Sequence, residues 1–313
     1  MAARLWAGAV LRRARHPQQP RARPDPAVTG AAAVRVTAVF PAFNSAHVIG
    51  RALAAVPRET PCIVVDNASR DATAAAARAA RADALIIQNP RNEGFGRACN
   101  IGLRASRTEF AAIINPDLFL ASDCLALCVA AADAHPQVAL FGADEAPDAA
   151  AQPGAIRPQA ALSGSMLLMR RAAIAPLGYF DEAIFMYFED ADLCLRARLA
   201  GLGVAAVAGA RAEHLSAAST APAFDNLLEK QRLWGMACAY FAAKHPDQPE
   251  GRQAARKLRR YALRAALPFV GGADRAILRA RLEGARRFRA EGAATMFDNR
   301  FVANAAAQMP STL

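Results

Sequence analysis

Two aspartates in this sequence lie at or just beyond the ends of apolar runs that are typical of buried strands. Asp66 follows the run 62–65, and Asp117 lies three residues after the run 110–114. A carboxylate at such a position is costly to bury unless it meets a partner. Asp66 is suited to bind a nucleotide base or ribose, and Asp117 a divalent metal ion. For either aspartate taken alone, capping of the following helix explains its presence equally well.

The loop between the third predicted strand and the next helix could bind a diphosphate. It contains Asn92, Gly94 and Gly96. Glycines allow the backbone to approach a phosphate closely, and the N-terminus of the following helix favours negative charge. The spacing differs from GxGxxG, so the sequence does not support a dinucleotide-binding fingerprint.

A third group of carboxylates, Glu189, Asp190 and Asp192, lies at the start of another predicted helix. Acidic residues there interact favourably with the helix dipole, which is the interpretation that we favour for Asp192. Asp190 could act as a general base that takes the proton of an acceptor hydroxyl, typically a contribution of about 10²–10⁴-fold. The adjacent Tyr187 and Phe188 could form a platform for a sugar or belong to the core.

His214 follows the last predicted strand of this region. A single histidine is more often structural than a ligand. Its imidazole could complete a metal site if the fold brings it near Asp117.

The elements that must position these residues alternate between strand and helix from residue 34 onward. The order βαβαβαβ predicts a parallel sheet with right-handed crossovers, and ligands bind beyond the carboxyl ends of such strands. The polar residues after the first four strands would therefore face one crevice. The predicted strands are 34–40, 62–65, 84–88, 110–114, 138–141, 165–169 and 204–207, the predicted helices are 45–56, 72–82, 97–106, 122–134 and one that ends at Gly201, and the chain is expected to be helical from 224 to 290.

Composition narrows the class of protein. The chain has 313 residues, of which 54% are hydrophobic and 21% charged, which is typical of a folded protein with a sizeable core. No stretch approaches the roughly 20 apolar residues of a membrane-spanning helix, so we expect no integral membrane protein. The six cysteines show neither a CxxC pair nor zinc-site spacing, which indicates reduced thiols in a cytoplasmic protein.

The net charge of +11 is concentrated at the two ends of the chain. Residues 251–290 contain twelve Lys and Arg against two acidic residues, whereas residues 36–250 contain more acidic than basic residues. This distribution argues against specific binding to nucleic acid. The predicted basic helices could lie on an anionic membrane or pack on the main domain with a solvated Arg face.

Seven segments in this order resemble glycosyltransferase family 2, and most closely its rhamnosyltransferase-like branch. Any one of them is a weak signal, whereas seven in order are a strong one, and together they extend over about residues 36–217. The segments are VFPAFN at 39–44, VDNASRD at 65–71, NEGFGRACN at 92–100, NPD at 115–117, GSMLLMRR at 164–171, GYFDE at 178–182 and YFEDADLCLR at 187–196.

The resemblance implies an α/β protein with the GT-A nucleotide-diphospho-sugar transferase fold, a Rossmann-like, mostly parallel sheet flanked by helices, here with a C-terminal helical appendage. It implies an inverting glycosyltransferase that uses a divalent cation, Mg²⁺ or Mn²⁺. The implied donor is a nucleotide-diphospho-sugar, dTDP-rhamnose by likeness to this branch. The implied acceptor is a hydroxyl of a growing bacterial surface glycan or of a lipid-linked glycan.

The resemblance also implies roles for individual residues. Asp190 of the Glu189–Asp190 pair would be the catalytic base, and Asp117 would be the metal-binding carboxylate, with His214 completing the metal site. Asn115 stands where many members of the family have a first aspartate, which implies a weaker metal site. The residues that would bind the donor nucleotide are Phe43, Asn44, Asp66, Asn67, Asn92, Gly94, Gly96, Asn100 and Asn115, and those that would contact the acceptor are Tyr187 and Phe188.

The expected organisation is a disordered Arg/Pro-rich leader at 1–33, a catalytic domain at 34–222, a basic helical appendage at 223–290 and a tail at 291–313. Within the catalytic domain, 34–141 would bind the nucleotide-sugar and 159–222 the acceptor. We expect the protein in the cytoplasm, with peripheral contact to the inner membrane. The alternatives are a nucleotidyltransferase that forms nucleotide-sugars, a basic protein that binds nucleic acid or membrane, and a non-catalytic binding module.

Overall fold

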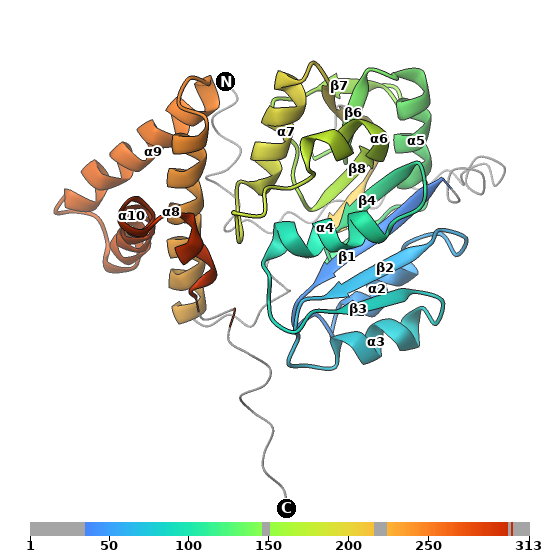
Figure 1. Cartoon of the computed structure of the whole chain (residues 1–313), viewed down its shortest axis with the longest axis horizontal. Helices are drawn as coiled ribbons and strands as arrows, with labels where there is room; N and C mark the ends of the chain where they lie inside the picture. The colour runs from blue at the N-terminus through green and yellow to red at the C-terminus, as the bar shows by residue number, and fades with distance from the viewer. Residues whose placement is uncertain (1–34, 146–150, 216–223, 300–301, 303–313) are drawn as a thin grey trace, which may run out of the picture.

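A mixed eight-stranded sheet with the order β3-β2-β1-β4-β8-β6-β9-β7 forms the centre of the larger part of the chain (Figure 1). This computed structural model describes residues 35–145, 151–215, 224–299 and 302. The predicted leader at 1–33 lies outside the described residues. The strands are β1 (Val36–Ala42), β2 (Cys62–Asp66), β3 (Leu85–Gln88), β4 (Phe110–Ile114), β6 (Val138–Gly142), β7 (Ile156–Pro158), β8 (Met166–Arg170) and β9 (Gly203–Val207).

The first four strands are parallel, because β2 pairs with β1 and β3, and β1 pairs with β4, all in the same direction. β8 lies antiparallel between β4 and β6, and β9 continues parallel to β6. The expected mostly parallel sheet is confirmed, with β8 and the edge strand β7 as its antiparallel members.

Helices cover both faces of the sheet, and every residue of β1, β2, β4 and β6 is buried as expected for strands covered on both sides. One face packs against α2 (Ile49–Ala54), α3 (Thr73–Ala80) and α5 (Cys124–Ala134). The other face packs against α4 (Phe95–Ala105), α6 (Arg171–Ile174), the 3-10 turn η1 (Ala175–Leu177) and α7 (Glu189–Leu199).

A second, two-stranded sheet lies beside the main one. It pairs β5 (Leu118–Leu120) with β10 (Ala212–His214) in antiparallel orientation, so that His214 lies opposite Leu118. Neither strand was predicted from the sequence, because each is only three residues long. This small sheet brings the end of the second half of the domain back to the segment that follows β4.

The helices expected between 224 and 290 are present as α8 (Phe224–Lys244), α9 (Pro249–Ala266) and α10 (Gly272–Glu291), which form a separate group beside the sheet (Figure 1). α8 and α10 cross at backbone contact, because a Cβ at Gly235 would lie 1.9 Å from the carbonyl oxygen of Arg281, and one at Gly284 would lie 2.0 Å from that of Arg232. Within the described residues, no helix combines the length and the apolar character needed to cross a membrane.

The expectation that 291–313 is a tail is wrong for its first residues. Residues Ala293–Phe297 form the 3-10 helix η2. Met296 is fully buried there, and the ring of Phe297 lies edge-on to Phe185 with 5.6 Å between ring centroids. Apolar burial against Phe185 therefore orders the segment that composition alone assigned to a tail.

Candidate functional site

The polar residues that follow β1, β2 and β4 lie at one edge of the sheet. Ala42 at the end of β1 pairs with Asp66 at the end of β2, and β4 runs beside β1 in the same direction. Phe43 and Asn44 therefore lie between Asp66 and Asp117 along this edge. The structure brings together the residues that the strand order predicted to share a crevice.

Asn67 organises the glycine loop, which is the segment 92–96 between β3 and the first turn of α4, through four hydrogen bonds. Its amide nitrogen donates to Asn92 Oδ1 at 2.7 Å and to the Gly94 carbonyl at 3.0 Å. Its amide oxygen accepts from the Asn89 side chain and from the Glu93 backbone N–H, both at 2.9 Å. Asn67 and Asn92 are both buried. They hold the shape of the loop, and the backbone N–H groups of Glu93 and Gly94 are already bonded to these two side chains, so the expected diphosphate contact with this part of the loop is not supported.

Asn44 and Asp66 also support the loops at this edge. Asn44 Oδ1 accepts from the Arg70 backbone N–H at 2.8 Å, and its own backbone N–H donates to Ser69 Oγ at 2.9 Å. Asp66 is buried, and its Oδ1 accepts from the Ser69 N–H at 2.9 Å. This last contact lies in a turn before α3, which begins at Thr73, so Asp66 does not cap the following helix as the sequence had left open. Its other oxygen accepts a long hydrogen bond of 3.4 Å from the Gln88 amide, the one contact found for it within the described ranges.

Gly94 occupies a position that no other residue fits. Its φ is +82°, and a Cβ there would lie 2.4 Å from the carbonyl oxygen of Phe185. The next residue donates its backbone N–H to that same carbonyl at 2.8 Å. The glycine loop is thus fastened to the segment that leads into α7, which carries Asp190.

We expect Gly94→Ala to lower the free energy of unfolding by about 1–3 kcal/mol, because the side chain forces a left-handed backbone and a clash with Phe185 together. Gly178→Ala is the matched control, because Gly178 has φ +85° but nothing within 4 Å of its would-be Cβ. Urea unfolding of both variants measures the difference. Equal losses in the two variants would show that the contact with Phe185 contributes nothing.

Gly96 and Asn100 lie on α4 against the segment 180–182. Asn100 is fully buried, and its amide accepts from the Phe180 N–H at 3.0 Å and donates to the Phe180 carbonyl at 2.9 Å. A Cβ at Gly96 would lie 3.3 Å from Phe180 Cβ. The structure therefore places both residues at the contact between the two halves of the domain.

Asp117 and His214 meet at the start of the β5–β10 sheet. The His214 Nε2 atom lies 3.2 Å from Asp117 Oδ1, and the Leu215 N–H donates to the Asp117 carbonyl at 3.1 Å. Asp117 is buried, whereas the His214 side chain is 37% exposed. The hydrogen bond to Asp117 raises the pKa of His214 above its ordinary value. The pair thus joins a buried carboxylate to an imidazole that solvent can reach.

The residues at this end of the site fit a divalent cation that is coordinated partly by the protein and partly by a bound diphosphate. Asn115 Oδ1 is buried and has no hydrogen-bond partner among the described residues. Together with Asp117 and His214 it provides oxygen and nitrogen donors of the kind that Mg²⁺ and Mn²⁺ accept. Within the described ranges, no cluster of three or more His, Cys, Asp or Glu side chains could hold a metal. The donor set is therefore suited to a cation whose other ligands come from a diphosphate.

Asp190 lies at the first turn of α7 and is held by backbone groups. Its Oδ2 accepts from the Gly164 N–H at 2.9 Å, and its Oδ1 accepts from the Ala191 N–H at 2.7 Å. Burial raises the pKa of Asp190, and these N–H bonds oppose that rise. A carboxylate whose pKa is raised is a stronger base than an ordinary aspartate, and its direction is fixed by the two hydrogen bonds.

Backbone hydrogen bonds connect the two ends of the site. The Asn115 N–H donates to the Ser165 carbonyl at 2.8 Å, and the N–H of the neighbouring Gly164 donates to Asp190 Oδ2 at 2.9 Å. The negative charge of Glu145, which follows β6, also raises the pKa of both His214 and Asp190. The segment 164–165 therefore links the strand end that carries Asn115 and Asp117 to the start of α7 that carries Asp190.

Glu189, next to Asp190, is a buried acid that stays protonated at neutral pH. It is 7% exposed, and its Oε2 has no hydrogen-bond partner among the described residues. Burial, reinforced by the charge of Asp190, raises its pKa to about 8. The Glu189–Asp190 pair therefore carries less than two negative charges at pH 7.

This shift makes stability depend on pH in a defined direction. Between the ordinary glutamate pKa of 4.5 and about 8, the folded chain holds a proton at Glu189 that the unfolded chain has lost. The free energy of unfolding should therefore fall as the pH rises through this window. We expect Glu189→Gln to flatten the fall, measured by urea unfolding at pH 5.5 and pH 8. Glu59→Gln, at an exposed position, is the control, and equal slopes for Glu189→Gln and wild type would contradict the assignment.

The two residues expected to contact the acceptor are involved in packing. The Phe188 ring lies 5.3 Å from Trp234 and 5.4 Å from Phe241, centroid to centroid, in the contact between α7 and α8. Tyr187 packs against the cluster around Phe185, and burial raises its pKa to about 12. The structure thus gives Phe188 the core position that the sequence left open.

Asp192 has partners that the sequence did not reveal. It is fully buried and contacts Arg196 at 2.7 Å, Lys244 at 2.7 Å and His245 at 2.8 Å. Lys244 also bonds to Asp181 at 2.6 Å. The helix-dipole interpretation of Asp192 is therefore incomplete, because its main contacts fasten α8 to the helix that carries Asp190.

Lys230 is a further residue that sequence reasoning missed. It lies on α8, where burial lowers its pKa, and the charge of Asp117 opposes part of that lowering. It lies one turn before Leu233, which packs in the same cluster as Phe43 and Phe185. The sequence signal for Lys230 was helical spacing, which places it on one side of the helix with Leu233, Ala237, Tyr240 and Lys244.

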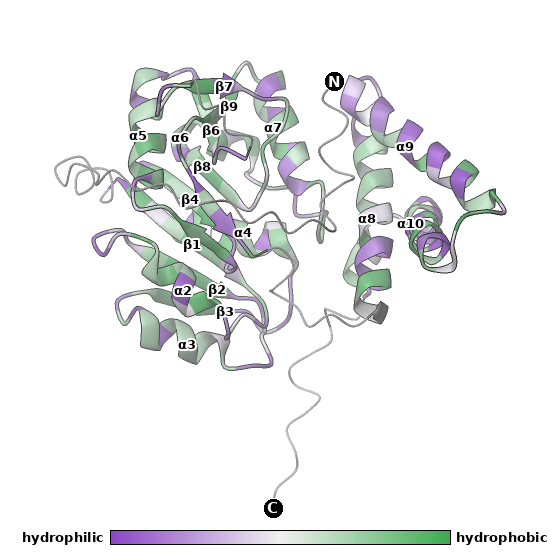
Figure 2. Cartoon of the chain, turned by 180° about the vertical axis from the view of Figure 1, so that it is seen from behind, coloured by the Kyte–Doolittle hydropathy of each residue, from purple (hydrophilic) through white to green (hydrophobic). Residues whose placement is uncertain are grey.

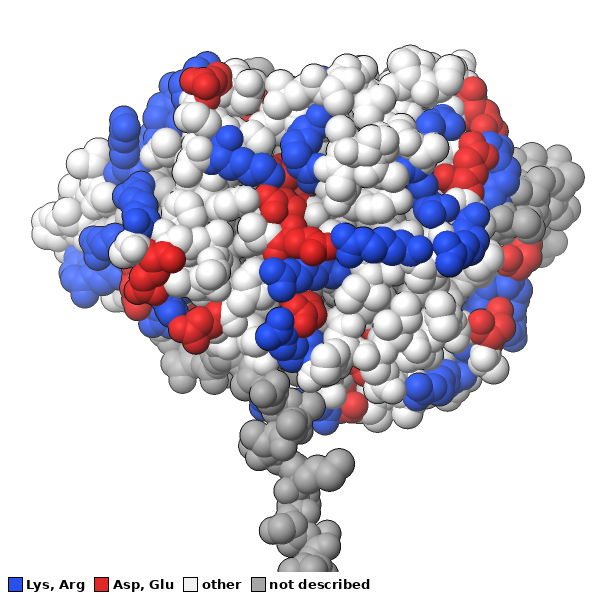
Figure 3. Space-filling view, viewed as in Figure 1, with Lys and Arg blue, Asp and Glu red and all other residues white. Residues whose placement is uncertain are grey.

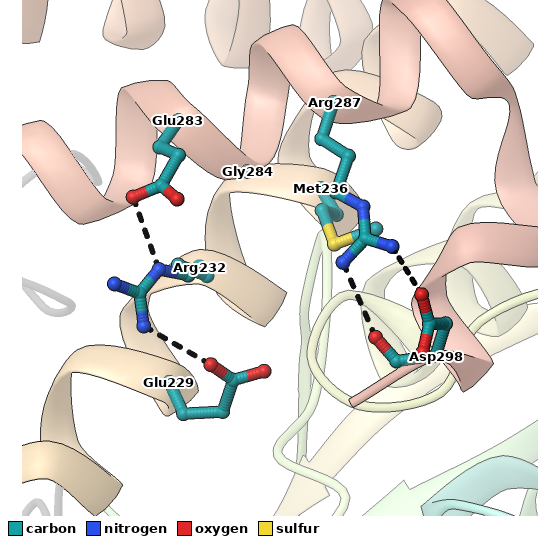
Figure 4. A pocket seen from close by; sticks show the side chains of 7 residues that line it. All are labelled: Glu229, Arg232, Met236, Glu283, Gly284, Arg287 and Asp298. Carbon is teal, nitrogen blue, oxygen red and sulfur yellow. Dashed lines mark hydrogen bonds and ion pairs between the residues drawn. The ribbon is translucent and has the colours of Figure 1, made fainter. Parts of the chain in front are cut away.

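A pocket between α8 and α10 lies in the helical group (Figure 4). Its two arginines are already neutralised, since Arg232 bonds to Glu229 and Glu283, and Arg287 bonds to Asp298. The pocket offers no unpaired cation for an anionic ligand, and we do not assign it to the site.

Comparison with known proteins identifies the family. The family model "Glycosyl transferase family 2" matches residues 37–174, and "Glycosyltransferase like family 2" matches residues 148–237. An uncharacterised glycosyltransferase of Mycobacterium tuberculosis is 39% identical over 82 residues, which are 26% of this chain and 36% of that protein. The N-acetylglucosaminyl-diphospho-decaprenol L-rhamnosyltransferase of the same species is 48% identical over 64 residues, which are 20% of this chain and 21% of that one. The chain therefore spans about a third or less of the length of these relatives.

The solved structures agree on the fold. A mannosyltransferase of Pyrobaculum calidifontis, solved with GDP-Man and Mn²⁺, superposes with a TM-score of 0.55 at 18% identity over 81% of this chain and 86% of that chain. At this identity the likeness establishes the fold only. The sheet order, the edge on which the polar residues gather and the two matching family models agree with one another. The chain belongs to glycosyltransferase family 2 and has the GT-A fold.

Proposed function

We propose that the protein is an inverting glycosyltransferase that moves a sugar from a nucleoside-diphosphate donor to a hydroxyl group. The observation that carries the proposal is that the Asp117–His214 pair lies at the carboxyl edge of a GT-A sheet, where the segment 164–165 connects Asn115 to Asp190 through backbone hydrogen bonds. Displacement of a diphosphate from an anomeric carbon requires neutralisation of the leaving charge and deprotonation of the nucleophile. The two ends of the site are suited to these two tasks.

Asp117 and His214, with Asn115 Oδ1, would hold Mg²⁺ or Mn²⁺. The cation supplies Lewis-acid stabilisation of the leaving diphosphate when it is bound. Lys230 adds a positive charge on the same side.

Asp190 would take the proton of the acceptor hydroxyl. Its two backbone hydrogen bonds fix the carboxylate, and Gly164 leaves room beside it, because a Cβ there would lie only 3.4 Å from Asp190 Cβ. A single base opposite the leaving group favours in-line attack and inversion at the anomeric carbon. The neutral Glu189 keeps a second charge away from Asp190.

For the sugar and the acceptor we propose rhamnose from dTDP-rhamnose and a lipid-linked or growing surface glycan. Support comes from a stretch of 64 residues that is 48% identical to part of a mycobacterial enzyme whose name gives rhamnose transfer to a lipid-linked sugar. We place the reaction in the cytoplasm, at the face of the inner membrane. The six described cysteines are free and buried, as reduced thiols in that compartment are.

A donor screen tests the proposal. The full chain is incubated with dTDP-rhamnose, UDP-glucose, UDP-N-acetylglucosamine and GDP-mannose, with lipid-linked acceptors, in Mg²⁺, Mn²⁺ or EDTA, and products are read by mass spectrometry. We expect a metal-dependent product with one donor. Formation of a nucleotide-sugar from a sugar phosphate and a nucleoside triphosphate would instead indicate a nucleotidyltransferase.

A further inference from the structure

The end of α9 exposes an apolar patch. Leu263 is 72% exposed, Leu267 is 40% exposed, and Phe269, in the turn before α10, is 80% exposed. Among the described residues, the other exposed large apolar side chains are scattered over β3, the end of α7, the end of β10 and α8. A cluster of three at one turn is costly to leave in water and marks a binding surface.

An arginine stripe leads to this patch along α9. Arg252, Arg256, Arg259 and Arg260 are exposed on the same side of the helix as Leu263 and Leu267, because these positions repeat with the helical period. Within the described part of the chain, Arg256, Arg259 and Arg260 have no ion-pair partner. Figure 2 shows the hydrophilic turns of α9 followed by its apolar end, and Figure 3 shows Lys and Arg gathered at the edge over α9 and α10.

The opposite side of α9 is occupied by the rest of the helical group. Ala254 and Leu258 are buried, and the Tyr261 ring lies 5.7 Å from the Trp234 ring of α8. The contacts of α9 with α8 therefore present the arginine stripe and the apolar patch to solvent. The patch is not needed to hold the helices together.

We propose that this surface, formed by Arg252, Arg256, Arg259, Arg260, Leu263, Leu267 and Phe269, docks on an anionic lipid bilayer. The three apolar side chains would enter the boundary between headgroups and acyl chains, and the arginines would lie against the lipid phosphates. A second copy of the chain fits this surface poorly, since two arginine stripes would repel each other. The inference agrees with the proposed lipid-linked acceptor, but the vesicle test below depends on neither donor nor acceptor.

Sedimentation with vesicles tests the proposal. The full chain is mixed at low salt with vesicles of phosphatidylglycerol and phosphatidylcholine, or of phosphatidylcholine alone, without donor or metal. We expect binding to the anionic vesicles that weakens as salt is added. The variant L263S/L267S/F269S should bind at least about tenfold more weakly, and R256Q/R259Q/R260Q roughly a hundredfold more weakly.

Two control variants test whether the loss of vesicle binding is specific to this surface. Leu85→Ser removes a 51% exposed leucine from β3 at the far edge of the sheet, and R58Q/R78Q/R107Q removes three exposed arginines of the sheet domain. Both should bind vesicles as wild type does, and circular dichroism should be unchanged in every variant because the substituted side chains are exposed.

Three results would overturn the proposal. The first is failure of the wild type to bind anionic vesicles at low salt. The second is wild-type binding by L263S/L267S/F269S, which would leave only general charge attraction. The third is a wild-type dimer in light scattering that the same variant makes monomeric, which would assign the patch to a second copy. A chain that binds vesicles but transfers no sugar would retain this inference while the proposed function fails.

Discussion

Asp190→Asn is expected to reduce the rate of sugar transfer by about 10²–10⁴-fold while leaving donor affinity near that of wild type. The amide has nearly the same shape, and its single oxygen can accept one of the two N–H groups, those of Gly164 and Ala191, that the Asp190 carboxylate accepts. An amide cannot take a proton from the acceptor at neutral pH. The loss should therefore fall on kcat, measured with the donor that the screen identifies.

The control for this variant is Asp83→Asn. Asp83 is 64% exposed, and among the described residues its ion-pair partner is Arg81, at a turn before β3 and remote from the sheet edge that carries the site. It should transfer sugar at the wild-type rate. Undiminished transfer by Asp190→Asn would remove the proposed base, and loss of donor affinity together with rate would indicate that Asp190 serves to position the donor.

Asp117→Asn is expected to abolish the part of nucleoside-diphosphate binding that depends on a divalent cation. A metal contributes several kcal/mol to stabilisation of phosphate charge, so we expect affinity for dTDP, UDP or GDP in Mn²⁺ to fall by at least about a hundredfold. Titration calorimetry in Mn²⁺ and in EDTA measures this directly and needs no acceptor. The variant should also lose the interaction that raises the pKa of His214.

The comparison with Asp190→Asn makes the test sharper. Asp190→Asn should bind the nucleotide in Mn²⁺ but fail to transfer, whereas Asp117→Asn should fail to bind it in Mn²⁺. His214→Gln should lie between Asp117→Asn and wild type, because the exposed imidazole is the less buried member of the pair. Metal-dependent affinity that is unchanged in Asp117→Asn would contradict the assignment of the cation to this side of the site.

The hydrophobic pattern of the sequence was sufficient to predict the main elements of the sheet domain. The strands β1, β2, β4, β6, β8 and β9 are continuous apolar runs, because each is covered on both faces, and such runs are visible without any structure. The direction of each strand was harder to predict from the sequence. The antiparallel orientation of β8 and the short β5–β10 pair depend on contacts between distant segments, which leave little periodic signal in three to five residues.

The sequence by itself determined which groups gather at the carboxyl edge, because the parallel strands end at the same edge of the sheet. The residues at or just after these strand ends include Asp66, Asn115 and Asp117. The sequence did not determine which of them are free to meet a ligand. The tertiary structure showed that Asn67, Asn92 and Asn100 hold loops, that Phe188 packs against Trp234, and that Asp192 fastens α8. The physical reason is that a buried polar side chain must satisfy its hydrogen bonds, and only the folded chain decides whether a backbone group, another side chain or an open site supplies the partner.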